Sequence, residues 1–118
     1  MSDRNRGPGN SVIRTIDPKQ VWFSQDSISY KFKDGGTIDD LAKGLQNGKI
    51  SVDEVPPIRL VQRNGEIYTL DNRRLAAFQQ AGVEVPYRMA TPQEIAKDAF
   101  KFTTANEGVT IRIRGGTR

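Results

Sequence analysis

The chain has 118 residues, with 18 lysines and arginines against 14 acidic residues, a formal net charge of +4 and an isoelectric point near 9.6. It contains neither cysteine nor histidine, which excludes disulfides, thiolate nucleophiles, cysteine-bound metals and imidazole general bases. Chemistry is therefore restricted to carboxylates, amines, guanidinium groups, hydroxyls, amides or an oxygen-bound metal, and the basic charge balance favours nucleic acid or a nucleotide as partner.

The length fits a single domain with one modest core. The chain begins with polar, glycine and proline residues that bury too little apolar surface to order themselves. We therefore predict a flexible polar tail over residues 1–15 and a single domain over residues 16–118. No stretch is apolar enough to be a membrane segment or a signal peptide, so the isolated chain is expected to be cytoplasmic.

The first strand is predicted over residues 20–24, where three successive bulky apolar residues occur. A polar cluster of Ser24, Gln25, Asp26 and Ser27 follows it. Clusters of this kind are typical of helix caps and Asx-turns. The functional alternative is that Gln25, Asp26 and Ser27 line the same cleft as two arginines that occur later in the chain.

The next element is predicted as a helix over residues 37–45, which Thr37 caps and an Asn-Gly pair follows, with a further short turn over residues 51–54. Its first turn contains Asp39 and Asp40, which are favourable near the positive end of the helix dipole. Adjacent positions on a helix point about 100° apart, so this pair is not predicted to bind a metal.

A hairpin is predicted next, with strands over residues 58–61 and 67–70 joined by a turn that contains Asn-Gly. A third strand is predicted over residues 83–89. Pro86 lies within it and favours either the edge of a sheet or the start of a strand, because proline has no N–H to donate.

Two elements complete the chain. Residues 91–94 form a complete helix start, with threonine as the cap, proline at the first helical position and glutamate at the third, and we expect this helix to extend to about residue 102. Residues 109–114 alternate between apolar and polar side chains, which predicts a half-exposed terminal strand.

The most informative segment is the helix predicted within residues 71–82, which Asp71 or Asn72 caps and whose first turn carries Arg73 and Arg74. The free N–H groups at a helix N-terminus bind anions, and guanidinium groups add forked, charge-assisted hydrogen bonds. Without an anion, two cations are unfavourable there. The pattern therefore predicts a phosphate site formed by Asn72, Arg73 and Arg74, and the structural alternative is that Asp71 or another acid pairs with the arginines.

The order of predicted elements resembles the ParB/sulfiredoxin-like fold. Residues 70–78 resemble the Gly-Glu-Arg-Arg type box with which that family binds nucleotide phosphates, and Arg73 and Arg74 match its paired arginines. Asp71 and Asn72 stand where the family has glycine and an acid or histidine. The resemblance implies an α+β fold with a small mixed sheet and flanking helices, without the sulfiredoxin cysteine and without the DNA-binding helix-turn-helix region of ParB.

A narrower resemblance covers residues 21–116. Residues 23–28, 32–35, 68–75 and 113–116 resemble the ParB-like toxin modules at the C-termini of bacterial polymorphic toxins of the contact-dependent inhibition and Rhs kinds. Such modules are mostly assigned as nucleases. The resemblance thus implies a nuclease domain that is delivered into a target cell as part of a larger secreted effector, with a cognate immunity protein as partner.

Three functions remain open from the sequence. A nuclease would bind nucleic acid through Arg73 and Arg74, with Asp71 and Asp26 as catalytic carboxylates or as ligands of a hard metal such as Mg²⁺. A binding module would hold CTP or ATP with the same arginines. A phosphotransfer enzyme would use ATP, with Ser27 or Asp26 acting on the γ-phosphate.

Overall fold

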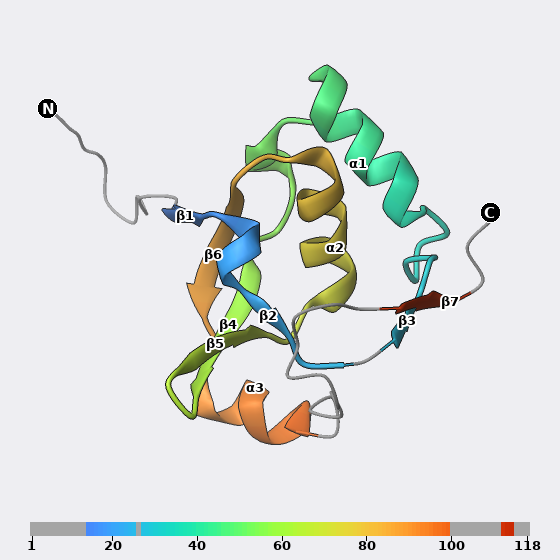
Figure 1. Cartoon of the computed structure of the whole chain (residues 1–118). Helices are drawn as coiled ribbons and strands as arrows, with labels where there is room; N and C mark the ends of the chain where they lie inside the picture. The colour runs from blue at the N-terminus through green and yellow to red at the C-terminus, as the bar shows by residue number, and fades with distance from the viewer. Residues whose placement is uncertain (1–13, 26, 100–111, 115–118) are drawn as a thin grey trace, which may run out of the picture.

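The computed structural model describes residues 14–25, 27–99 and 112–114, which form an α+β fold with a five-stranded mixed sheet and three α-helices (Figure 1). In chain order the elements are β1 (Arg14–Ile16), η1 (Pro18–Gln20), β2 (Trp22–Phe23), β3 (Ser27–Ser29), α1 (Ile38–Asn47), η2 (Val52–Glu54), β4 (Ile58–Arg63), β5 (Glu66–Thr69), α2 (Asn72–Ala81), β6 (Val85–Met89), α3 (Pro92–Lys97) and β7 (Arg112–Arg114). The predicted class, α+β with a mixed sheet and flanking helices, is confirmed at this level. No helix in the described part of the chain is long and apolar enough to cross a membrane.

The large sheet has the strand order β1-β6-β4-β5-β2. Strands β4 and β5 form the predicted antiparallel hairpin, in which Leu60 pairs with Thr69. Its turn holds Asn64 and Gly65 at positive φ angles of 52° and 81°. Asn-Gly adopts this conformation at little cost, which explains why the sequence signal for the hairpin was reliable.

Strand β2 lies on the other side of β5 and runs parallel to it, with Phe23 paired to Thr69. The carboxyl ends of two parallel strands meet at the same edge of a sheet. The chain that leaves β2 therefore lies beside the chain that leaves β5 and enters α2, and this edge is where the candidate site forms.

Two features of the sheet differ from the predictions. Strand β1 was not predicted: Arg14 and Thr15, which the sequence places in the polar tail, pair with β6. Of the two positions predicted for Pro86, the sheet edge is wrong, because β6 lies between β1 and β4, whereas the start of a strand agrees with its place as the second residue of β6. The proline is tolerated since it is the second residue of β6 and precedes the ladder with β4, which begins where Ile58 pairs with Tyr87.

Helices α1 and α2 confirm their predicted positions. The Thr37 hydroxyl accepts a hydrogen bond from the backbone N–H of Asp40 at 3.0 Å, and Gly48 ends α1 in the left-handed conformation. Helix α2 lies between the sheet and α1 (Figure 1). Its buried Leu75 and Phe78 belong to the core, which they share with residues of the sheet, of α1 and of the loops beside them. Burial of these side chains holds the start of α2 in a fixed position on the sheet edge.

Helix α3 begins with the predicted capping box, in which Thr91 and Glu94 each accept a hydrogen bond from the other's backbone N–H. It ends at Lys97, short of the predicted limit near residue 102. None of its residues is buried, and a helix without a packed apolar face has little to extend it.

The predicted terminal strand is confirmed in part. Residues 112–114 form β7, which runs parallel to β3 in a separate two-stranded sheet and pairs Ile113 with Ile28. Residues 109–111 lie outside the described residues.

Candidate functional site

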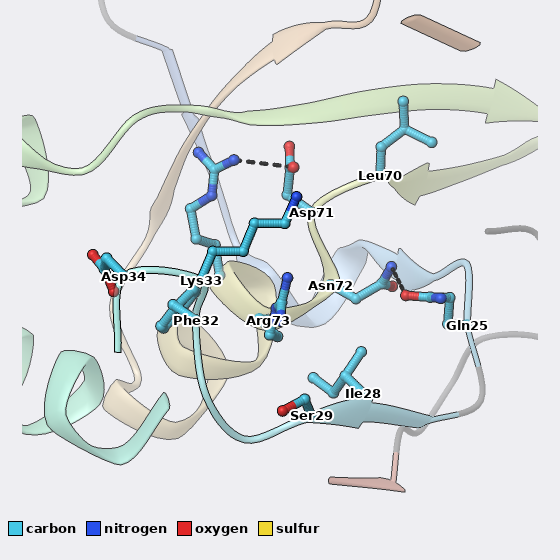
Figure 2. Close-up of a pocket in the computed structure, with 11 residues that line it drawn as sticks. Gln25, Ile28, Ser29, Phe32, Lys33, Asp34, Leu70, Asp71, Asn72 and Arg73 are labelled. Atoms are coloured by element: carbon cyan, nitrogen blue, oxygen red, sulfur yellow. Dashed lines mark hydrogen bonds and ion pairs between the residues drawn. The ribbon is translucent and has the colours of Figure 1, made fainter. Parts of the chain in front are cut away.

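A cavity of about 470 Å³ lies at the start of α2 (Figure 2). Two segments far apart in the sequence form its walls, one within residues 25–34 and the other over residues 70–74. Gln25 from the polar cluster and Arg73 and Arg74 from α2 all line it, as the functional alternative predicted. Ser27 is not among the lining residues, and Asp26 lies outside the described residues.

The polar cluster does not cap a helix. Ser27 begins strand β3 instead, so the interpretation of residues 24–27 as a helix cap is wrong. The physical reason is that the polar groups of Ser24 and Gln25 bond to Asn72 of α2. The Asn72 side-chain oxygen accepts a hydrogen bond from the Ser24 N–H at 2.8 Å, and its amide nitrogen donates to the Ser24 hydroxyl and to Gln25 Oε1.

Asn72 is 3 % exposed, and these three hydrogen bonds use nearly all of its bonding capacity. Its side chain therefore joins the end of β2 to the start of α2. The sequence predicted that Asn72 binds phosphate, but this side chain is not free to do so. The backbone N–H of the same residue remains a candidate ligand.

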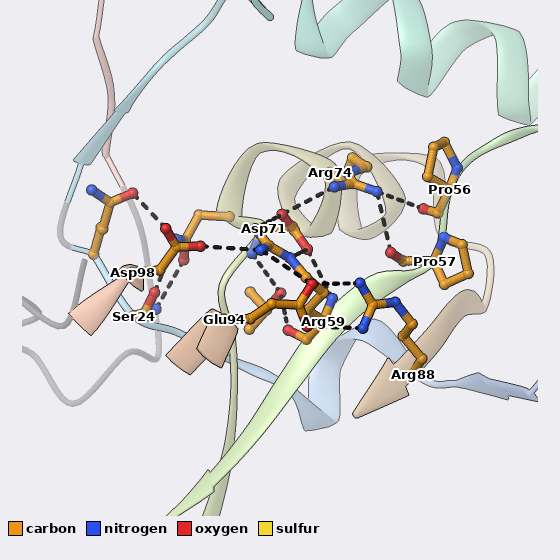
Figure 3. A network of polar contacts seen from close by, with 12 residues as sticks. Ser24, Pro56, Pro57, Arg59, Asp71, Arg74, Arg88, Glu94 and Asp98 are labelled. Carbon is orange, nitrogen blue, oxygen red and sulfur yellow. Dashed lines mark hydrogen bonds and ion pairs between the residues drawn. The ribbon is translucent and has the colours of Figure 1, made fainter. Parts of the chain in front are cut away.

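Asp71 is the centre of an ion-pair network (Figure 3). Its carboxylate accepts hydrogen bonds from the Arg59 backbone N–H at 2.8 Å, from Arg59 Nε at 3.0 Å and from Arg59 Nη2 at 2.7 Å, and it lies 3.0 Å from Arg74 Nη2. These donors occupy both carboxylate oxygens. The side chain is only 7 % exposed.

The surroundings of Asp71 hold it in the charged form. Burial raises the pKa of its carboxyl group, but the hydrogen bonds from Arg59 and the charges of Arg59 and Arg74 outweigh burial, so that the net pKa lies below its ordinary value. A carboxylate with a lowered pKa and both oxygens engaged is a poor general base. The geometry therefore supports a structural role for Asp71 rather than the predicted catalytic one.

Arg74 follows the structural alternative from the sequence. Besides its contact with Asp71, its Nη1 donates to the Pro56 carbonyl at 2.7 Å and to the Pro57 carbonyl at 3.2 Å. It thereby joins α2 to the loop before β4. Arg74 still lines the cavity, but most of its guanidinium group is committed to the protein.

Arg73 is the arginine that remains available. Its Nη1 donates to the Lys31 carbonyl at 2.9 Å, and its guanidinium group lies 5.8 Å from the centre of the Phe32 ring. No carboxylate within residues 14–25, 27–99 and 112–114 forms an ion pair with it. Lys33, also a cavity-lining residue, extends over the start of α2 in Figure 2.

The N-terminus of α2 lacks the cap that the other helical elements have. A side chain of Thr37, Thr91, Asp17 or Ser51 accepts a backbone N–H at the start of α1, α3, η1 and η2 respectively. Asp71 stands at the corresponding position of α2 but makes no such bond, because its carboxylate is turned to the arginines. The first N–H groups of α2 thus have no acceptor in the part of the chain that the structure describes.

The central cation of the network is Arg59, which sequence reasoning missed. Besides Asp71, it contacts Asp98 at 3.1 Å and Glu94 at 3.8 Å, and Arg88 pairs with Glu94 at 2.7 Å. The bonds to Asp71 and the surrounding carboxylates raise the pKa of Arg59, although burial opposes them. These contacts also hold α3 against the sheet.

A signal for Arg59 was present in the sequence. A two-residue Asn-Gly turn fixes the register of its hairpin, and the register that pairs Leu60 with Thr69 places Arg59 opposite Leu70, next to Asp71. The Leu70 N–H donates to the Arg59 carbonyl at 2.9 Å, which confirms this placement.

The described residues contain no group of three or more acidic side chains arranged to hold a metal ion. Three carboxylates do approach one another near the start of α2, but they surround the Arg59 guanidinium, which supplies the balancing positive charge.

Comparisons with protein-family models, with curated proteins and with solved structures found no match.

Proposed function

We propose that this protein binds the phosphate groups of a nucleotide or nucleic acid in the cavity at the start of α2. The observation that carries the proposal is the combination of an uncapped helix N-terminus with the Arg73 guanidinium and the Lys33 amine in one cavity. Backbone N–H groups, the positive end of the helix dipole and two cations are complementary to an anion with several oxygens.

The Asp71–Arg59 pair supports the proposal indirectly. A carboxylate free to cap α2 would occupy the N–H groups and repel a phosphate. In this protein the arginines hold the Asp71 carboxylate away from those N–H groups and offset its charge. The same contacts fix the start of α2 against β4, so the N–H groups are positioned before a ligand arrives.

Binding has more support than hydrolysis. A nuclease or phosphotransfer enzyme needs a group that activates its nucleophile. Asp71 has both oxygens engaged, and Asp26, the other carboxylate predicted for this role, lies outside the described residues. Phosphate binding is therefore the part of the expected toxin activity that the site geometry favours.

Isothermal titration with inorganic tripolyphosphate tests the proposal. Removal of the Arg73 guanidinium in Arg73→Ala is expected to weaken binding about tenfold or more, since a hydrogen bond to a charged group contributes roughly 1.5–3 kcal/mol. Lys43→Ala removes one exposed positive charge from α1, outside the cavity, and is the matched control. Equal affinity of Arg73→Ala and the wild-type protein, with unchanged melting temperatures, would refute the proposal.

The toxin function stays a prediction from resemblance and has its own test. Induction of the wild-type chain in the bacterial cytosol is expected to arrest growth, and Arg73→Ala is expected not to. Nucleic acid from the arrested cells then separates two mechanisms. Cleaved DNA or RNA would indicate a nuclease, whereas intact nucleic acid would indicate that the protein sequesters or modifies nucleotides. Normal growth at high expression of a folded wild-type chain would contradict the toxin function.

A further inference from the structure

A second cavity, of about 500 Å³, adjoins the proposed phosphate site. It lies between α1 and the segment of residues 50–56. Phe32, Asp34 and Arg74 line both cavities, so these side chains form the boundary between them. A ligand bound at the start of α2 therefore has a neighbouring space into which it can extend.

The second cavity differs chemically from the first. Its walls include Leu41, Ile50 and Val55, which give it an apolar surface. Asp40 and Glu54 also line it; both residues are exposed, and neither carboxylate has a cation partner in the described segments of the chain. The second cavity is thus apolar and acidic, with Asp34 as a third carboxylate at the boundary between the two, whereas the first adds free backbone N–H groups and cations.

Arg74 lines both cavities but does little to neutralise the carboxylates of the second cavity. Arg74 lines the second cavity, but its guanidinium is bonded to Asp71, Pro56 and Pro57. A further phosphate in the second cavity would therefore meet the carboxylates of Asp34, Asp40 and Glu54, none of which has a cation partner in the described residues. That arrangement disfavours a continuous nucleic acid strand, which would bring negative charge through both cavities.

We propose that the second cavity binds the base of a mononucleotide whose phosphates occupy the site proposed above, so this inference rests on that site. Asp40 and Glu54 select bases with an exocyclic amino group. An aromatic base matches apolar walls of this size. Amino groups donate hydrogen bonds, and carboxylates accept them strongly. Adenine and cytosine carry such an amine, whereas uracil does not.

The test compares ATP, CTP, UTP and inorganic tripolyphosphate by isothermal titration against the whole chain. ATP and CTP are expected to bind about tenfold more tightly than UTP and tripolyphosphate, which corresponds to one additional hydrogen bond to a charged group. The double variant Asp40→Asn/Glu54→Gln is expected to lose this preference and to keep its affinity for tripolyphosphate. Asp53→Asn, which removes a neighbouring exposed carboxylate outside the cavity, is the matched control.

The outcomes separate this inference from the phosphate site itself. Equal binding of all four ligands, still dependent on Arg73, would overturn the base site and leave the phosphate site standing. A single-stranded oligonucleotide that bound more tightly than ATP and CTP would also overturn it. Failure of tripolyphosphate and of every nucleotide to bind the folded wild-type chain would refute the phosphate site, and the base site with it.

Discussion

Replacement of Asp71 by asparagine tests whether this residue is structural. Asparagine caps a helix about as well as aspartate, so the substitution would have little effect on stability if Asp71 were a cap. The structure predicts a large effect instead, because the carboxylate accepts three hydrogen bonds from Arg59 and pairs with Arg74 while only 7 % of the side chain is exposed.

The magnitude follows from these contacts. Asparagine keeps one carbonyl oxygen, which can still accept from the Arg59 backbone N–H, but its amide NH₂ meets guanidinium donors and cannot accept from them. Loss of one partner from a buried ion pair costs about 3–5 kcal/mol. We expect a loss near the lower limit, about 3 kcal/mol, and a fall in melting temperature of roughly 10 °C for a chain of this size.

Urea denaturation followed by circular dichroism measures the loss. Asp17→Asn is the matched control, since Asp17 caps η1 through the Lys19 N–H at an exposed position where asparagine can replace it. A double-mutant cycle with Arg59→Gln is expected to give a coupling free energy above about 1 kcal/mol. A loss below about 1 kcal/mol in Asp71→Asn would refute the structural role.

Three further predictions concern pH, packing and the contact between β2 and α2. The pKa of Asp71 lies below its ordinary value, and that of Glu94 is lowered to about 2. The free energy that these charged carboxylates contribute to folding is therefore present above about pH 4.5 and is lost as the pH falls toward 2. Urea titrations at several pH values check this, and Glu94→Gln should reduce the loss of stability at low pH. Gly44→Ala is expected to destabilise the protein by about 1–3 kcal/mol although alanine favours helices, because its Cβ would overlap the Ile50 side chain. In an Ile50→Ala background, which removes the two closest atoms, the same change should cost less. Asn72→Ala should lower the free energy of unfolding by about 1–3 kcal/mol, since it leaves buried polar groups unpaired, and a change below about 0.5 kcal/mol in thermal or urea unfolding would contradict this.

Part of the site was predictable because its signals are local. The place of Arg73 in the first turn of α2 follows from a helix start that the sequence marks clearly. The proximity of Gln25 to this helix start was one of two alternatives, and the parallel pairing of β2 with β5 decided between them. Phe32 and Lys33 also line the cavity, and both lie in the segment that connects β3 to α1. Their position could not be predicted, because the sequence of this segment has no periodic pattern of apolar residues.

The sequence by itself determined the hairpin, the two long helices and the capping box of α3, because each depends on side chains within a few residues of one another. Only the tertiary structure decided what Asp71 does. An aspartate at a helix start bonds either to the helix N–H groups or to any stronger donor nearby, and the strand register brings Arg59 to within 2.7 Å of its carboxylate. This contact leaves the first N–H groups of α2 without a side-chain cap, so that they are available to the phosphate that we propose as a ligand.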